Sequence, residues 1–114
     1  MAVKRGHKFV TKAIETKMAK SPLRSKDGDV RNAPVIVKFF SIASECRWYV
    51  VEAEKQEDGD WLCFGLVDGN YKELGYFMLS ELANAAHPMF RGVAAIERDC
   101  YFGKHKLGDF MDAE

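Results

Sequence analysis

Apolar and polar residues alternate through the middle of the chain, which is the pattern of β-strands. In the first such stretch Val35, Val37 and Phe39 fall on one face, and only Lys38 interrupts the apolar residues of the other. The connections between stretches are short, and two of them contain glycine with aspartate, which favours tight turns. Strands joined in this way pair with their neighbours in antiparallel order. The predicted strands are residues 35–42, 47–54, 61–67 and 71–79.

A short helix is predicted before the sheet, at about residues 11–20. Thr11 can serve as its N-cap, and Pro22 stops it. Val10, Ile14 and Met18 recur every four residues and form an apolar stripe. A helix of about ten residues is marginal in isolation. We therefore expect the stripe to pack on the sheet.

The chain after residue 79 predicts one more strand and two short helical segments. Ser80 can cap a helix that runs to about residue 86, and residues 96–102 are a candidate for the fifth strand. Residues 105–113 can form a final helical turn or two. The predicted fold is α+β: an antiparallel four- to five-stranded meander sheet, strongly bent, with a short N-terminal helix and short C-terminal helices.

Charge divides the chain into two unequal parts. Residues 1–32 carry nine Lys or Arg against three acidic residues, whereas the other 82 residues carry eight against fourteen. The formal net charge of zero therefore conceals a head of +6 and a body of −6. The composition changes at the same place. We predict one domain overall, made of a basic N-terminal helix and connector (1–33) and a single α+β domain (34–114).

The expected location is the cytoplasm, without membrane association. No apolar run approaches the roughly 20 residues that span a bilayer, and residues 1–12 lack the apolar segment of a secretory signal. The three cysteines are widely spaced, and no two of them form a CxxC motif. Neither a disulfide framework nor a zinc site is therefore expected. Cys63 and Cys100 lie in apolar or aromatic stretches, which predicts that both belong to the core.

No arrangement of residues predicts a catalytic site. Cys100 could form a nucleophile–base pair with one of the histidines of the chain. The sequence fixes no third group that would orient this Cys–His pair. Glu52 and Glu54 share one face of a predicted strand, whereas Lys55 points to the other face, so the carboxylate–lysine arrangement of a metal-dependent nuclease does not form. Glycine-rich phosphate-binding motifs are absent. We assign no catalytic residue, no metal site and no cofactor.

A charged cluster is predicted near the fifth strand. Arg98 is expected on the same face as Cys100 and Phe102, and an arginine on an apolar face needs a carboxylate partner or a path to solvent. Two interpretations stay open: an internal ion pair, for instance with Glu73 or Glu81, and a polar binding site at a strand end. The members of this structural polar cluster are Glu73, Glu81, Glu97, Arg98 and Asp99.

Several sequence blocks in a fixed order resemble a known family. The blocks are residues 35–40, 48–49, 64–66, 73–82 and 96–102. In this order they are similar to a family of small bacterial and phage proteins, found also on plasmids and integrative elements, that is defined only as a domain of unknown function. The resemblance implies an accessory protein of a phage or mobile element, and it supplies no enzymatic residues.

The first function hypothesis is a small non-enzymatic accessory protein of a phage or mobile genetic element that binds a host or phage protein. Such a protein can modulate or inhibit a host factor, for instance a defence complex. Surfaces of opposite charge speed the encounter with a partner, and aromatic residues are enriched at interfaces. The candidate partner-binding residues are Arg5, Lys8, Lys12, Lys20, Arg24, Lys26, Trp48, Glu52, Glu54 and Trp61.

The alternative is nucleic-acid binding through residues 1–32, whose lysines and arginines, Lys17 and Arg31 included, would contact phosphates. No helix-turn-helix or zinc-finger signature accompanies them. The same basic helix can instead pack on the acidic sheet of its own chain or of a partner subunit. An enzyme with an unrecognised site is a third hypothesis. The sequence does not define the oligomeric state.

Overall fold

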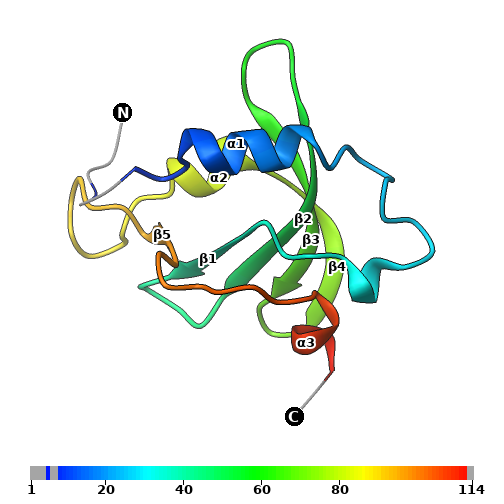
Figure 1. The fold of residues 1–114 in the computed structure, drawn as a ribbon. Coiled ribbons are helices and arrows are strands. Elements are labelled where there is room, and N and C mark those ends of the chain that lie inside the picture. Colours follow the sequence, from blue (N-terminus) through cyan, green and yellow to red (C-terminus); the bar gives the residue numbers. More distant parts are fainter. Residues whose placement is uncertain (1–4, 6–7, 113–114) are drawn as a thin grey trace.

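The part of the chain that the computed structural model describes, residue 5 and residues 8–112, contains one antiparallel sheet of five strands (Figure 1). The other positions of the predicted head and of the C-terminal end lie outside the described residues. The strand order is β4-β3-β2-β1-β5. This arrangement confirms the α+β class with an antiparallel sheet. The strands are β1 (Val37–Ser41), β2 (Arg47–Lys55), β3 (Trp61–Asp68), β4 (Lys72–Met78) and β5 (Ile96–Arg98).

Strands β1 to β4 each pair with the next, as predicted, and β5 returns to pair with β1. The pairing of β5 ends at Arg98, so the strand expected over residues 96–102 is too long. Asp99 turns the chain, because its carboxylate accepts a hydrogen bond from the backbone N–H of Tyr101 at 3.0 Å. Cys100 is therefore exposed, and its predicted place in the core is wrong.

The N-terminal helix α1 (Lys12–Ala19) forms as predicted. The hydroxyl oxygen of Thr11 accepts a hydrogen bond from the N–H of Ile14 at 3.2 Å, which caps the helix. Met18 is completely buried, and Val10 and Ile14 pack against the same cluster. Burial of a side chain of this size contributes about 2 kcal/mol, so the apolar stripe holds α1 on β2.

Helix α2 (Leu79–Ala83) begins one residue before Ser80, so Ser80 is not its N-cap. The carboxylate of Glu81 accepts a hydrogen bond from the N–H of Met78 at 3.1 Å at the start of the helix. Ser80 instead donates its N–H and its hydroxyl to the carboxylate of Asp60, just before β3. The 3-10 turn η1 (Val30–Asn32) and helix α3 (Gly108–Met111) are the remaining elements. No helix among the described residues combines the length and the apolar character needed to cross a membrane.

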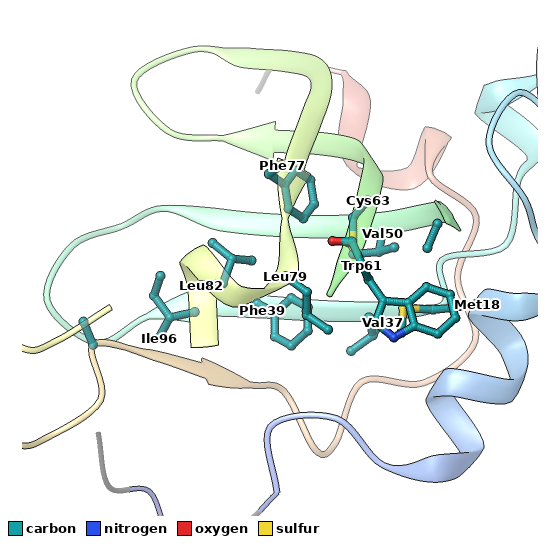
Figure 2. Close-up of a cluster of buried hydrophobic side chains, with 12 residues drawn as sticks. Met18, Val37, Phe39, Val50, Trp61, Cys63, Phe77, Leu79, Leu82 and Ile96 are labelled. Atoms are coloured by element: carbon teal, nitrogen blue, oxygen red, sulfur yellow. The ribbon is translucent and has the colours of Figure 1, made fainter. Parts of the chain in front are cut away.

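Two apolar clusters cover the two faces of the sheet. The first lies under α1 and α2 and includes the completely buried Phe39. Figure 2 shows this cluster, with Met18 and Trp61 at one end and Leu82 and Ile96 at the other. The first cluster therefore joins both helices to strands β1, β3 and β5.

The C-terminal segment covers the second face. The rings of Tyr49 on β2 and Phe110 on α3 are stacked, with their centroids 4.4 Å apart. Leu66 of β3 and Leu107 are buried in the same cluster. The backbone N–H of Leu107 donates to the carbonyl of Ala33 at 2.9 Å, which fixes this segment beside the chain that leads into β1.

Strand β2 contains a β-bulge at Val51. The pairing with β3 shifts between Val50 and Glu52, so Val51 has no partner in β3. The two strands approach very closely beside the bulge. A Cβ atom added to Gly65 of β3 would lie 1.7 Å from the carbonyl oxygen of Tyr49, so this position accepts only glycine.

The bulge binds the connector that follows α1. The hydroxyl of Ser21 donates to the carbonyl of Val51 at 2.7 Å. The carbonyl of Ser21 accepts a hydrogen bond from the N–H of Ala53 at 2.9 Å. Ser21 therefore pairs with backbone groups on both sides of Glu52, and it is itself buried.

Glu52 lies inside the molecule, although the sequence analysis named it as a candidate partner-binding residue. It is 2% exposed, and its two carboxylate oxygens accept hydrogen bonds from the backbone N–H groups of Arg24 and Lys26, both at 2.7 Å. Arg24 has a φ of +73°, a conformation that is strained for a residue with a side chain. The carboxylate of Glu52 thus holds a strained turn of the connector on β2.

Substitution of Gly65 tests the close approach at the bulge. We expect Gly65→Ala to lower the free energy of unfolding by about 3 kcal/mol, because the methyl group meets backbone that cannot move independently. Gly75→Ala on β4 is the matched control: Gly75 lies opposite Gly65, and an added Cβ meets no atom within 4 Å. Urea unfolding measures both. Equal stability of the two variants would contradict this account of the bulge.

Substitution of Glu52 tests the attachment of the connector. We expect Glu52→Ala to lower the free energy of unfolding by about 2–4 kcal/mol, because two backbone N–H groups lose a charged acceptor. Glu54→Ala removes an exposed carboxylate from the same strand and is expected to change stability by less than about 0.5 kcal/mol. Thermal and urea unfolding compare the two. A loss for Glu52→Ala no larger than that of the control contradicts the assigned role.

Candidate functional site

A cleft of about 630 Å³ opens between the end of α1, the start of β1 and the chain that follows β5. It forms because this chain leaves β1 and later pairs with the residues that lead into β1. The last contact before the gap is the N–H of Asp99, which donates to the carbonyl of Lys38 at 3.0 Å. The chain rejoins where the N–H of Val35 donates to the carbonyl of His105 at 2.9 Å. The C-terminal end of α1 and the connector form the other wall.

Positive charge dominates the lining of this cleft, which we call the cationic cleft. Six cationic side chains line it, against the single carboxylate of Asp99. With His105 neutral, the lining has a formal charge of +5 in a chain whose net charge is zero. The six cations are Lys17, Lys20, Lys26, Lys38, Arg98 and Lys104.

Two of the six cations have internal partners. The ammonium group of Lys38 is 3.6 Å from the carboxylate of Asp99 and lies 5.7 and 5.8 Å from the ring centroids of Tyr49 and Phe102. The guanidinium of Arg98 donates to two backbone carbonyls. Within the described part of the chain the other four ammonium groups, those of Lys17, Lys20, Lys26 and Lys104, form no ion pair.

The structure brings only Lys20 and Lys26 of the predicted partner-binding residues into the cleft. Arg5 points inward: its guanidinium is 3.2 Å from the carboxylate of Glu97 and donates to the carbonyl of Ile96 at 2.9 Å. The exposed members that lie outside the cleft are Lys8, Lys12, Arg24 and Glu54, whereas Trp48 is half-buried against the first apolar cluster.

Two of the predicted partner-binding residues are buried, which contradicts the expectation that they are exposed. Trp61 is 7% exposed and packs in the first apolar cluster, because the hairpin turn before it places its ring under α1 rather than in solvent. Glu52 is buried where the connector crosses β2. Both side chains are therefore part of the interior.

The predicted structural polar cluster does not form as one group. Arg98 donates to the carbonyls of Lys8 at 2.9 Å and Phe9 at 3.1 Å, so its expected ion pair with Glu73 or Glu81 is wrong. Glu73 is exposed on β4, and Glu81 caps α2. The other two members form separate ion pairs, neither of them with Arg98. Backbone carbonyls of the chain before α1 accept hydrogen bonds from Nε and Nη2 of Arg98 in place of a carboxylate.

Sequence reasoning missed Lys38 and Lys104 as members of a site. Lys38 carried a signal, since it is the one charge on an otherwise apolar face of its strand. Nothing in the sequence pointed to Lys104, because it is far from α1 along the chain. Lys104 reaches the cleft only because the next residue, His105, is hydrogen-bonded to Val35.

A second surface lies at the opposite edge of the sheet, along β4. Leu74 is 42% exposed and Tyr76 is 58% exposed, and both side chains lie on one face of the strand. Tyr71 precedes the strand and is 78% exposed. The ring of Tyr76 is 4.9 Å from that of Phe64 on β3, so the exposed apolar row continues onto the next strand. The alternation in β4 resembles that of the core strands, so sequence reasoning did not separate this edge from them.

Burial and hydrogen bonds shift the pKa values of two further side chains, Tyr49 and Asp60. Burial raises the pKa of Tyr49, and nearby carboxylates add to this shift while Arg47 opposes it. For Asp60, burial acts to raise the pKa, but hydrogen bonds from the Ser80 hydroxyl and from the N–H groups of Trp61 and Ser80 outweigh it and lower the pKa. Both groups are therefore held in their ordinary charge states at neutral pH.

The cysteines have different environments. Burial raises the pKa of Cys63 to about 12, with a smaller contribution from Asp60. Cys100 is exposed and Cys46 is half-buried. Among the described residues no group of three or more His, Cys, Asp or Glu side chains is placed to hold a metal ion.

These surfaces belong to a small α+β protein with a cationic cleft at one edge of its sheet and an exposed apolar strand at the other. The chain matches the family described as "Protein of unknown function (DUF2958)" over residues 9–114, and it belongs to that family. This confirms membership in a family defined as a domain of unknown function. Neither the search of curated proteins nor the search of solved structures found a match.

Thiol labelling tests the assigned environments of the cysteines. We expect Cys100 to react readily with a maleimide in the native protein, whereas Cys63 reacts only after unfolding. Burial raises the pKa of Cys63 to about 12, so the reactive thiolate scarcely forms at neutral pH, and the side chain is completely buried. Mass spectrometry of peptides from labelled protein, with and without denaturant, locates the modified residues. Rapid native labelling of Cys63 would contradict the structure of the first apolar cluster.

Proposed function

We propose that the protein is a small non-enzymatic accessory protein of a phage or mobile genetic element that binds a host or phage protein through β4. A host factor such as a defence complex is the proposed target. The observation that supports this proposal is the open edge of β4, where Leu74 and Tyr76 are exposed. A resemblance of the sequence to proteins of phages and mobile elements supports the accessory role.

From Leu74 onward the edge of β4 lacks the features that usually protect a sheet edge. Charged side chains, prolines and bulges normally discourage pairing with another chain. In β4 the two charged residues, Lys72 and Glu73, stand at the start, and the following five residues are uncharged. Its pairing with β3 is regular from one end to the other. The backbone of this strand is therefore arranged to accept a further strand.

The side chains of β4 indicate which strand would fit. Leu74, Tyr76 and Met78 alternate along the face that carries Phe64 and Leu66 of β3. A strand added to β4 continues this face when its own apolar residues alternate in the same period, because cross-strand neighbours pack side by side. The proposed partner segment is thus extended, with an apolar residue at every second position and no proline in its centre.

Peptide display tests this binding mode directly, because the library itself selects the segment that fits. Panning a library of random peptides of about ten residues against the whole protein should enrich sequences with alternating apolar residues. We expect the enriched peptides to protect the amides of β4 from hydrogen exchange. Tyr76→Lys should weaken their binding about tenfold or more, because it places a charge in the apolar row.

Phe90→Lys is the matched control, because Phe90 is 59% exposed and lies in the loop after α2, outside β4. It should leave peptide affinity unchanged. Circular dichroism confirms that both variants are folded. Failure to enrich any alternating sequence, or enriched peptides whose binding is equally strong to Tyr76→Lys, would remove the proposed role of β4.

A further inference from the structure

The cationic cleft is separate from β4, and its charge calls for an explanation of its own. Four lysines around it have no ion-pair partner among the described residues, and only one carboxylate lines it. Cations collected on facing walls repel one another, and this repulsion is relieved when an anion enters between them. The charge of the cleft therefore points to an anionic ligand.

The two walls place cations on opposite sides of the same space. Lys17 and Lys20 are three residues apart at the end of α1, a spacing that puts both on one side of a helix. Lys104 belongs to the chain that follows β5, on the other wall. An anion held between the walls can contact ammonium groups from both. Several cations around one group favour phosphate, which offers more charge and more acceptor oxygens than a carboxylate.

The floor of the cleft is apolar. Pro34, Val35, Ile36 and Val37 lie between the charged walls, and the ring of Phe102 lines the same space. The volume of about 630 Å³ falls in the range of pockets that bind small molecules and cofactors. A ligand that fills the cleft therefore has an anionic part for the lysines and a flat or apolar part for the floor.

We propose that the cationic cleft binds the phosphate groups of a nucleotide, either free or as a unit of single-stranded nucleic acid. The lysines contact phosphate oxygens, and the base lies against the apolar floor beside Phe102. A double helix keeps its bases stacked inside and presents only its backbone and groove edges, so it leaves this floor unused. Lys17, Lys20 and Lys104 are the residues on which binding depends.

Fluorescence anisotropy with labelled single strands of about 12 nucleotides, DNA and RNA, tests the proposal at low salt. Unlabelled ATP, added as a competitor, distinguishes a free nucleotide from a strand. We expect Lys17→Glu and Lys104→Glu each to raise the dissociation constant about tenfold, because each reverses a charge beside the phosphates. A plot of log affinity against log salt for the strand should have a slope of roughly −2 to −3 and become shallower in both variants.

Arg91→Glu is the matched control, since Arg91 is exposed, lies outside the cleft and gives the same change in net charge. It should alter affinity by less than about twofold. Tyr76→Lys on β4 should leave nucleotide binding intact, which separates this proposal from the one for β4. Absence of binding to both strands and ATP overturns the proposal. So does equal affinity for poly-aspartate, or equal loss of binding in Arg91→Glu.

Discussion

The bulge at Val51 in β2 is the constraint on which the rest of the structure depends. It requires the close approach of β2 to Gly65, where no side chain fits. It also leaves backbone groups of β2 available to Ser21, which makes two hydrogen bonds there. Glu52 then turns inward and holds the strained turn at Arg24. The single bulged residue Val51, with its neighbour Glu52, thus joins the basic N-terminal part of the chain to the sheet.

The same attachment builds one wall of the cationic cleft. The backbone N–H of Lys26 donates to Glu52, while the side chain of Lys26 lines the cleft. A buried acidic residue therefore positions a basic one through its backbone, and the ammonium group forms no ion pair with any described residue. The opposite wall is set by the contact of Asp99 with Lys38 and by the return of the chain at His105. Segments far apart in the sequence meet because each is hydrogen-bonded to β1, to the residues just before it, or to β2.

Alternation of apolar residues predicted four strands and their order, because each strand is defined by neighbours in the sequence. It failed after the bulge. Regular alternation places Ala53 with Tyr49 and Val51, yet Ala53 joins the cluster under α1, and Glu52 moves to the opposite face. A shift of one residue moves every later side chain of the strand to the other face of the sheet, and no local sequence pattern predicts the shift. The end of β5 at Arg98 was equally hidden, because the turn at Asp99 is fixed by side-chain bonding rather than by polarity. The cleft depends on both events, so the sequence pointed to three of its lysines, Lys17, Lys20 and Lys26, but not to the site that they line.

The two candidate surfaces arise because the two edges of the open sheet are covered to different extents. An edge exposes unpaired backbone groups and must be covered or left as a binding site. At the β1 and β5 edge the returning chain covers the backbone only in part, and the gap is lined by cations. At the other edge no described strand pairs with the outer side of β4, and Leu74 and Tyr76 are exposed there. Three strands separate these edges, so a ligand in the cleft does not obstruct a strand on β4. Electrostatic attraction in the cleft weakens with salt, whereas apolar strand pairing does not, so ionic strength separates the two kinds of binding.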